Sequence, residues 1–422
     1  MVTESQAEQV ADSNPGGPYT GAEGRFFELD ILRGLASYLV VIFHYKHFLY
    51  SDADGFDYVH LPFLTVLEPV YVYGQFFVEL FFSISGYVFF WLYAKALAER
   101  KLGVKSFFIA RISRLYPLFF ATFIAVAIIQ WTFHALYGYD YIYQNNSVGN
   151  FVLNLFMVHQ WVPHAEMSFN GPSWSISVEM FLYTLFFIFS YVRLNKPVMV
   201  AAMIVLALIF RHLEADQAIN FVRGAPSFFL GGLAYYVVQD LRGLKDRKWL
   251  KIIDTTLKWT LPVLWLITYL RTQPQIWMAL TGAGQPGPLP YVQVSHVWDT
   301  AEGFIFGLIP LTLVALGLRQ DRWRWSLLSR ERLHAFSWIG DISYSLYLLH
   351  FPLQIAVMIC VAGWLPQQRI ALFGSPLFFI AFMTVATLLA RASYTYFEMP
   401  ARKTLKGWLT RRLDRHRQAK AA

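Results

Sequence analysis

Apolar segments of bilayer length recur along most of the chain. From about residue 30 onward, mostly apolar stretches alternate with short polar connections, and a helix of about 17 to 25 such residues crosses the hydrocarbon core of a membrane. The pattern predicts an all-α fold, a polytopic membrane helical bundle of about ten transmembrane helices. The expected spans are residues 30–50, 72–94, 116–134, 174–192, 197–212, 224–240, 254–271, 300–318, 336–360 and 373–394.

Composition supports an integral membrane protein. Charged residues make up 15% of the 422 residues and the mean hydropathy is +0.41, whereas a soluble domain carries about a quarter charged residues. The single cysteine, Cys360, excludes an intramolecular disulfide and an all-cysteine metal site. No other metal-ligand spacing, P-loop or nucleophile elbow is found, so no metal is expected.

The basic residues are confined to alternate connections. Lys and Arg gather after the second, sixth and eighth spans and in the tail from Arg402 to Lys420, whereas residues 51–73 and 135–173 contain none. By the positive-inside rule, both termini are expected in the cytoplasm. The net charge of +8 is therefore a topology signal, and nucleic-acid binding is not expected. Residues 1–24 are predicted to be a disordered cytoplasmic tail and residues 401–422 a basic cytoplasmic tail.

The first span carries two ionisable residues on one face. Arg33 and His44 are eleven residues apart, which is almost three helical turns and roughly 16 Å along the axis. Ionisable groups at membrane depth are costly and usually face the interior or a wet cavity. The pair therefore predicts a polar path through the protein.

Helical rise and the expected topology place other polar residues at two depths. His44, Glu79, Glu179 and His350, from four spans, all fall in the outer part of the membrane. In contrast, the guanidinium groups of Arg33, Arg111 and Arg114 fall at the cytoplasmic rim. Two polar layers at opposite depths suit a reaction whose reactants arrive from opposite sides.

The chemistry that fits these layers is group transfer. A neutral His44 can take a proton from an alcohol, and a carboxylate, Glu179 or Glu79, can orient it. Arginine forks at the inner rim match a phosphate-bearing donor. The residues leave open whether His44 acts as the base or first accepts the transferred group.

Several of these residues also have structural interpretations. His350 can be a hydrogen-bonded core residue, and Glu79 can pair with a neighbouring helix. Arg111 and Arg114 lie at i and i+3 on one helix face and can be positive-inside anchors. Trp174 can belong to an aromatic belt at the membrane interface.

Six motifs between Glu28 and Lys403 resemble those of the acyltransferase family 3 membrane acyltransferases. The first is the Arg, ten residues, His arrangement of ELDILRGLASYLVVIFH. The others, in chain order, are VELFFSISGYVFF, FFIARISRLYPLFF, NGPSWSISVEMFLY, GDISYSLYLLHFPL and YFEMPARK. Ile31 departs from the pattern, because glycine is common at that position.

The resemblance implies a function and a cofactor-like donor. Residues 25–400 are expected to be an acyltransferase transmembrane domain that moves an acyl group, commonly acetyl from acetyl-CoA, to a hydroxyl of an extracytoplasmic carbohydrate or glycolipid. It implies that His44 is the key catalytic residue and that Arg33, Arg111 and Arg114 bind the acyl-CoA donor. We expect Glu179 and Glu79 to assist catalysis, and Trp174 and His350 to contact the substrate.

The expected location is a bacterial inner membrane, where the chain is multi-pass and surrounded by lipid. The main alternative is a proton-coupled transporter or exporter that uses the histidine and glutamate layer as a proton relay. That alternative predicts substrate movement driven by a pH gradient and no release of CoA. The absence of an internal sequence repeat weighs against it. The acceptor, the acyl chain length and the oligomeric state stay open.

Overall fold

The computed structural model describes residues 26–51, 55–162, 165–213, 220–272, 301–319 and 330–421. The predicted disordered tail, residues 1–24, and most of the connection between residues 272 and 299 lie outside these ranges. Within the described part, helices dominate, and the strands are one hairpin of two residues per strand, β1 (Tyr50–Ser51) and β2 (Gly55–Phe56). The prediction of an all-α chain is therefore confirmed.

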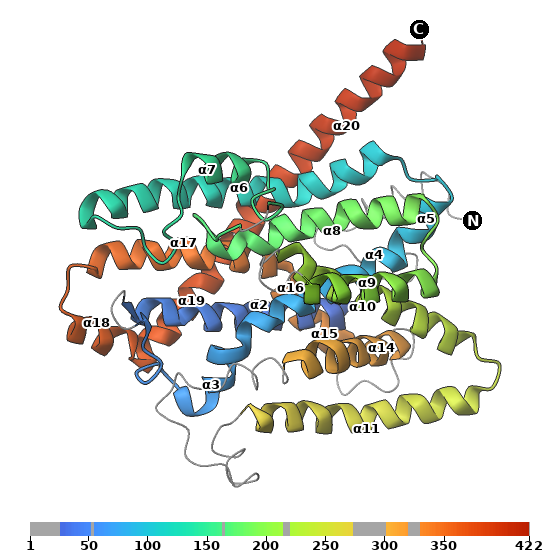
Figure 1. Ribbon diagram of the computed structural model, residues 1–422, viewed down its shortest axis with the longest axis horizontal. Helices are drawn as coiled ribbons and strands as arrows, with labels where there is room; N and C mark the ends of the chain where they lie inside the picture. Colours follow the sequence, from blue (N-terminus) through green and yellow to red (C-terminus); the bar gives the residue numbers. More distant parts are fainter. Residues whose placement is uncertain are drawn as a thin grey trace.

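The helices lie mostly along the long axis of the molecule and form one bundle (Figure 1). The first half contains α2 (Phe27–His44), η1 (Tyr45–Leu49), α3 (Leu64–Tyr73), η2 (Gly74–Phe76), α4 (Phe77–Leu92), α5 (Ala94–Ala98), α6 (Val104–Tyr137), α7 (Val148–Leu155), η3 (Gly171–Ser173), α8 (Trp174–Tyr191) and α9 (Pro197–Leu213). The second half contains α10 (Asn220–Gly243), α11 (Arg247–Arg271), η4 (Gly303–Leu308), α14 (Ile309–Arg319), α15 (Arg330–Phe336), α16 (Trp338–Asp341), α17 (Ser343–Val361), α18 (Pro366–Phe373), α19 (Pro376–Ser393), η6 (Tyr394–Glu398) and α20 (Met399–Ala421).

Each predicted span overlaps helical residues, but several boundaries differ, and the predicted span 336–360 is divided among α15, α16 and α17. Five helical stretches in the described ranges are long and apolar enough to cross a membrane: residues 64–92, 104–137, 171–191, 343–361 and 376–415. The stretch 104–137, helix α6, is longer than the predicted span 116–134, because Gly103 precedes it, no helix breaker occurs before Pro117, and Gly138 ends it at a φ of +83°. The basic tail continues α19 as the helix α20, which points away from the bundle (Figure 1).

Close helix contacts hold the bundle together at glycines. A Cβ atom on Gly86 of α4 would lie 1.8 Å from the backbone oxygen of Phe228, and one on Gly231 of α10 would lie 1.9 Å from that of Ser83. These two helices therefore pack backbone to backbone, as small residues allow in membrane proteins. Gly340 of α16 lies equally close to α2, since a Cβ there would be 2.2 Å from the Asp30 oxygen.

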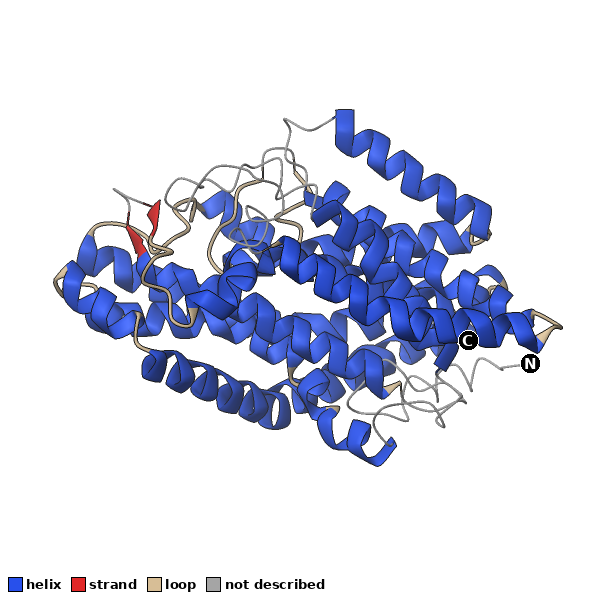
Figure 2. Cartoon of the chain, turned by 90° about the horizontal axis from the view of Figure 1, so that it is seen from below, coloured by secondary structure: helices blue, strands red, loops and turns tan. Residues whose placement is uncertain are grey.

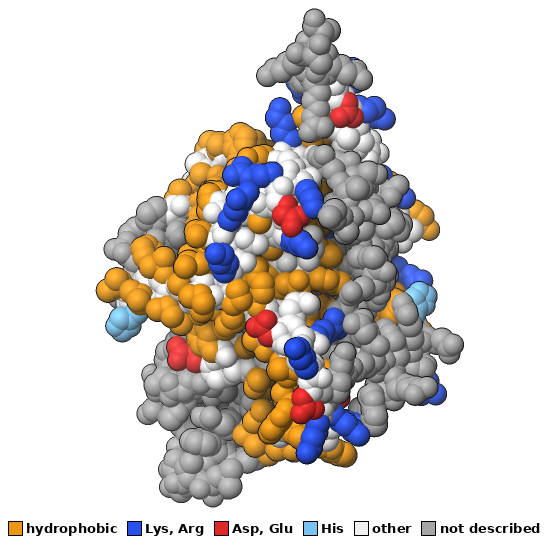
Figure 3. All heavy atoms as spheres, turned by 90° about the vertical axis from the view of Figure 1, so that its right-hand side faces the viewer, with side chains coloured by type: hydrophobic (Ala, Val, Ile, Leu, Met, Phe, Trp, Pro, Cys, Tyr) orange, Lys and Arg blue, Asp and Glu red, His pale blue; other side chains and the backbone are white. Residues whose placement is uncertain are grey.

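One end of the bundle carries many basic side chains. The β1–β2 hairpin lies at one end (Figure 2), and α5 lies at the other (Figure 1). The end that carries α5 displays Lys and Arg side chains among apolar ones (Figure 3). Exposed members include Lys95, Arg100, Lys105 and Lys196. This distribution agrees with the positive-inside pattern of the sequence, and the sides on which the termini lie stay a prediction.

Candidate active site

A cavity lies in the middle of the bundle, between α2, α4, α6, α8 and α17. The space open to the centres of water-sized molecules is about 70 Å³, several times the roughly 10–15 Å³ that one water needs. Its lining residues are Arg33, Val78, Phe81, Phe82, Ile84, Ser85, Val88, Phe89, Arg114, Leu115, Ser175, Ile176, Glu179, Ser343, Tyr344 and Tyr347. Most of these are aromatic or aliphatic, with a few charged and hydroxyl groups at fixed places.

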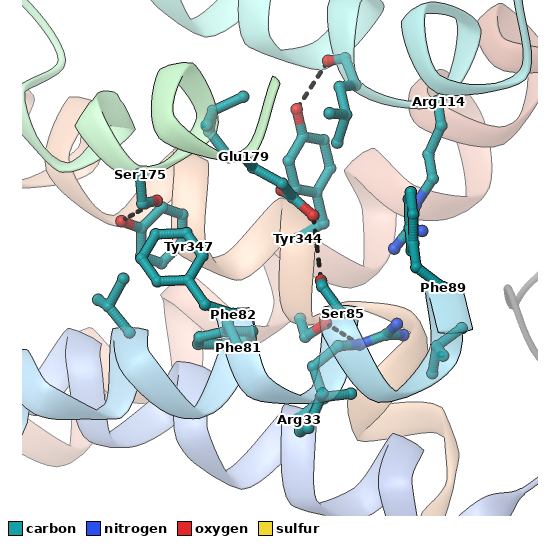
Figure 4. Close-up of a pocket in the computed structure, with 16 residues that line it drawn as sticks. Arg33, Phe81, Phe82, Ser85, Phe89, Arg114, Ser175, Glu179, Tyr344 and Tyr347 are labelled. Carbon is teal, nitrogen blue, oxygen red and sulfur yellow. Dashed lines mark hydrogen bonds between the residues drawn. The ribbon is translucent and has the colours of Figure 1, made fainter. Parts of the chain in front are cut away.

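The charged groups are ordered along the cavity (Figure 4). Arg33 and Arg114 lie at one end, and Ser175 and Tyr347 lie at the other, with Glu179 between them. Arg33 is held by α16 and α17, because its Nε donates to Ser343 Oγ at 3.0 Å and its Nη2 donates to the Gly340 carbonyl at 2.6 Å. The sequence predicted Arg33 and Arg114 at the same rim, and in the structure both line the same end of the cavity (Figure 4).

Glu179 faces the cavity from α8. Its carboxylate accepts a hydrogen bond from Ser85 Oγ at 3.3 Å and another from the Tyr183 hydroxyl. None of the hydrogen bonds described for this carboxylate involves an imidazole. The sequence placed Glu179 at the depth of the histidines, whereas the structure places it among the groups that line the arginine-bearing cavity.

Three histidines gather beyond the other end of the cavity. His44 is the last residue of α2, and its ring stacks on that of His350 of α17 with centroids 4.9 Å apart. His47, one turn later in η1, has its ring centroid 5.1 Å from that of His44. His44 Nδ1 lies 3.0 Å from the Val40 carbonyl, and a proton donated there leaves the lone pair on Nε2. His44 is thereby set up as a base.

Some buried polar atoms beside these rings are poorly satisfied. Within the described ranges, no hydrogen bond of good geometry reaches either nitrogen of His350, Nδ1 of His47 or Oε1 of Gln354. All three side chains are buried, and Gln354 uses its amide nitrogen to bond the His44 carbonyl at 2.8 Å. Buried polar groups in native proteins are nearly always paired. The cluster therefore has the properties of a site that binds water or a polar ligand.

Tyr347 separates the cavity from the imidazoles. Its side chain lines the cavity, and its ring centroid lies 6.0 Å from that of His350. Its hydroxyl donates to the Pro172 carbonyl and shares a hydrogen bond of 2.8 Å with Ser175. Neither His44 nor His350 belongs to the cavity lining. The sequence placed His350 by its depth, and the structure adds Tyr347 one turn before it.

Glu79 of α4 and Trp174 of α8 both lie close to Arg223 of α10. Glu79 forms an ion pair of 2.6 Å with Arg223 and accepts a hydrogen bond of 2.9 Å from Ser227. The Trp174 ring packs against Phe82 and lies 5.0 Å from the Arg223 guanidinium. These contacts match the helix-pairing interpretation of Glu79 and place Trp174 in the interior, where it is 5% exposed.

Arg111 and Arg114 have different surroundings although both are on α6. Arg111 donates to the Tyr93 hydroxyl at 2.7 Å, and its guanidinium lies 4.7 Å from the Tyr93 ring centroid and 5.0 Å from that of Phe89. Arg111 is buried but does not line the cavity, whereas Arg114 does. The structure thus brings Arg33 and Arg114 together and sets Arg111 behind the aromatic wall.

Sequence reasoning assigned no role to several residues near the site. Glu398, in the YFEMPARK motif, is buried and accepts a hydrogen bond of 2.6 Å from Ser345. Lys46 packs its ammonium 3.8 Å from the Phe43 ring centroid and donates to the Tyr58 hydroxyl at 3.1 Å. His47 and Tyr347 also received no role. Each lies three residues from a histidine of the pair, His44 or His350, and this helical spacing was the available signal.

The chain is similar in sequence to known proteins. A protein from Streptomyces mycarofaciens described as "Acyltransferase MdmB" is 30% identical over 125 residues, which is 29% of this chain and 30% of that protein. The chain is thus matched over about a third of that relative's length. No solved structure matches the chain significantly. The sequence profile of the acyltransferase domain matches residues 26–394, and the chain therefore belongs to this acyltransferase family, a family of transferase enzymes.

Proposed function

We propose that the chain is an integral membrane O-acyltransferase that moves an acyl group, in the simplest case acetyl, from cytoplasmic acyl-CoA to a hydroxyl of an extracytoplasmic carbohydrate or glycolipid. The observation that carries the proposal is the order of groups along the cavity. Guanidinium groups lie at one end, and beyond the other end lies a stacked imidazole pair. The acyltransferase family match supports the reaction type.

The donor is assigned to the arginine end. Phosphates are recognised by guanidinium forks, which donate paired hydrogen bonds in a plane. Arg33 and Arg114 line the cavity there, and Arg111 adds positive potential from behind the wall. The aromatic and aliphatic middle of the cavity suits the uncharged pantetheine arm. The exposed Lys and Arg residues around α5 support a cytoplasmic position for this end.

The transfer step is assigned to His44. Its Nε2 takes the proton of the acceptor hydroxyl, and the oxygen forms a bond to the thioester carbonyl carbon. The C–S bond then breaks, and the CoA thiolate receives the proton held by the imidazole. A route in which His44 first accepts the acyl group also fits the geometry. Glu179 is assigned to donor positioning, His350 and Trp174 to the acceptor side, and Glu79 to the support of α10.

The test is acyl transfer by the whole chain in proteoliposomes. Labelled acetyl-CoA is supplied on one side and a surface-glycan fraction on the other, and ester formation is measured. His44→Ala should abolish product while the protein still elutes as the wild type does. His134→Ala is the matched control. His134 is exposed, pairs with Asp140 at 3.1 Å and does not line the cavity. Normal ester formation by His44→Ala would overturn the assignment.

A further inference from the structure

One aromatic side chain lies between the donor cavity and the imidazole pair. The cavity ends at Tyr347, and the ring centroid of Tyr347 lies 6.0 Å from that of His350. The His350 ring in turn stacks on that of His44, with centroids 4.9 Å apart. These three rings form a continuous row. A thioester bound in the cavity is therefore kept from His44 by the Tyr347 and His350 rings.

Tyr347 is fixed in this position from two sides. Its hydroxyl is bonded to the Pro172 carbonyl of η3 and to Ser175 of α8, and its ring lies 6.1 Å from that of Phe81 of α4. The side chain is 5% exposed. The net contribution of such hydrogen bonds to stability is small, because water can replace the protein partner. The ring is therefore held firmly at rest, yet its displacement has a modest free-energy cost.

An unshielded imidazole base would not distinguish an alcohol from water. His44 has its Nε2 lone pair available when Nδ1 donates to Val40, and water is present in large excess over any acceptor. A transferase that exposes its thioester to this base would lose the acyl group by hydrolysis. Exclusion of water from the reacting groups is one established way in which enzymes prevent such side reactions.

We propose that Tyr347 is a specificity-determining residue that, while no acceptor is bound, keeps the bound thioester away from His44 and so suppresses hydrolysis of the donor; the ring is displaced when the acceptor binds. This inference rests on the proposed function, because it takes the cavity to be the acyl-CoA site. The suppressed reaction balances as follows: His44 takes a proton from water, and the water oxygen bonds to the thioester carbonyl carbon. The C–S bond breaks, and the CoA thiolate receives the proton, which yields a free carboxylic acid and CoA.

The experiment measures CoA release from acetyl-CoA by the purified full-length chain with no acceptor present. Tyr347→Ala should raise the rate of thiol release roughly tenfold or more, which corresponds to about 1.4 kcal/mol or more of barrier. Tyr347→Phe retains the ring and should release much less CoA than Tyr347→Ala. The double variant Tyr347→Ala, His44→Ala should lose the increase, because the base is gone.

Tyr137→Ala is the matched control. Like Tyr347, Tyr137 donates its hydroxyl to a backbone carbonyl, in its case that of Ile359 at 2.7 Å. Unlike Tyr347, it does not line the cavity. It should release CoA at the wild-type rate. Binding of acetyl-CoA to each variant is measured by calorimetry, and Tyr347→Leu replaces the alanine variant if the latter does not fold.

The outcomes separate the inference from the function on which it rests. Unchanged CoA release by a Tyr347→Ala or Tyr347→Leu chain that binds acetyl-CoA as the wild type does would overturn the inference and leave the proposed function standing. An increase that survives the loss of His44 would overturn it as well. A wild-type chain that binds no acetyl-CoA would instead overturn the proposed function, and the inference with it.

Discussion

The imidazole rings of His44 and His350, from α2 and α17, stack with centroids 4.9 Å apart and an interplanar angle of 29°. Replacement of His350 by Phe keeps a flat ring in the stack and removes both nitrogens. We expect this variant to lower kcat for acyl transfer roughly 10- to 100-fold, since a lost hydrogen bond to a charged or reacting group corresponds to about 1.5–3 kcal/mol. KM for acetyl-CoA should stay unchanged, because His350 does not line the cavity that we propose binds the donor. Initial-rate kinetics check this, and an unchanged kcat would assign His350 to packing.

Arg114 and Arg111 should contribute unequally to donor binding. Arg114 lines the cavity, whereas Arg111 is engaged by the Tyr93 hydroxyl and ring. Arg114→Gln is expected to raise KM for acetyl-CoA about tenfold or more through loss of a charge-assisted contact. Arg111→Gln should raise it less and should lower the melting temperature more. Equal KM changes without loss of stability would show that both guanidinium groups touch the donor.

The Glu79–Arg223 pair should matter for folding. Glu79 is 1% exposed, and its removal leaves the Arg223 guanidinium without its carboxylate. We expect Glu79→Ala to destabilise the chain by about 3 kcal/mol or more, because one partner of a buried pair is left behind. The double variant Glu79→Leu, Arg223→Leu should recover part of that loss. Thermal unfolding in detergent is the measurement, and a fully active, equally stable Glu79→Ala chain would contradict the structural role.

The contact between α4 and α10 should tolerate no side chain at Gly86. A Cβ atom there would meet the Phe228 backbone oxygen at 1.8 Å, and backbone cannot move aside as a flexible side chain can. Gly86→Ala is therefore expected to lower the melting temperature and the folded yield strongly. Gly307→Ala is the control, because no atom lies within 4 Å of the added carbon there. Similar behaviour of the two variants would argue against close contact of α4 and α10.

His159 should make the segment between α7 and η3 sensitive to acid. Burial lowers the pKa of His159 from 6.5 to about 3, so the folded state binds this proton less readily than the unfolded state. The associated stability is present above pH 6.5 and is lost as the pH falls toward 3, by about 2 kcal/mol at pH 5. His159→Phe, which keeps a ring against Phe119, should remove this part of the acid sensitivity. Hydrogen exchange of residues 155–170 at pH 7.5 and pH 5 gives the comparison.

The sequence predicted the helices well because their signal is local. Apolar periodicity and Gly or Pro at the ends are read residue by residue, and every expected span overlaps helical residues. The boundary of α6 was missed because Arg111 and Arg114 were counted with a polar connection, although charged residues form helices readily.

The sequence predicted that His44 and His350 share a level along the bundle, but it did not predict lateral neighbours. His44 and His350 were placed at one depth, and they are in ring contact. Glu79 was placed at the same depth, yet it pairs with Arg223 of α10, 144 residues later in the chain. Helical rise gives a position along the axis, but the rotation and packing of each helix decide which side chains meet. For the same reason the sequence alone did not single out Tyr347, whose contact with His350 depends on how α17 is rotated and packed.

The continuous helix α6 has a consequence for how the protein sits in lipid. Its 34 residues extend about 51 Å, well beyond a hydrocarbon thickness of roughly 30 Å. A rod of this length has to lean over or protrude. Protrusion on the side of Val104 would place its first two turns at head-group level, and the donor that we propose could then reach the arginines of α6 without entering the hydrocarbon layer.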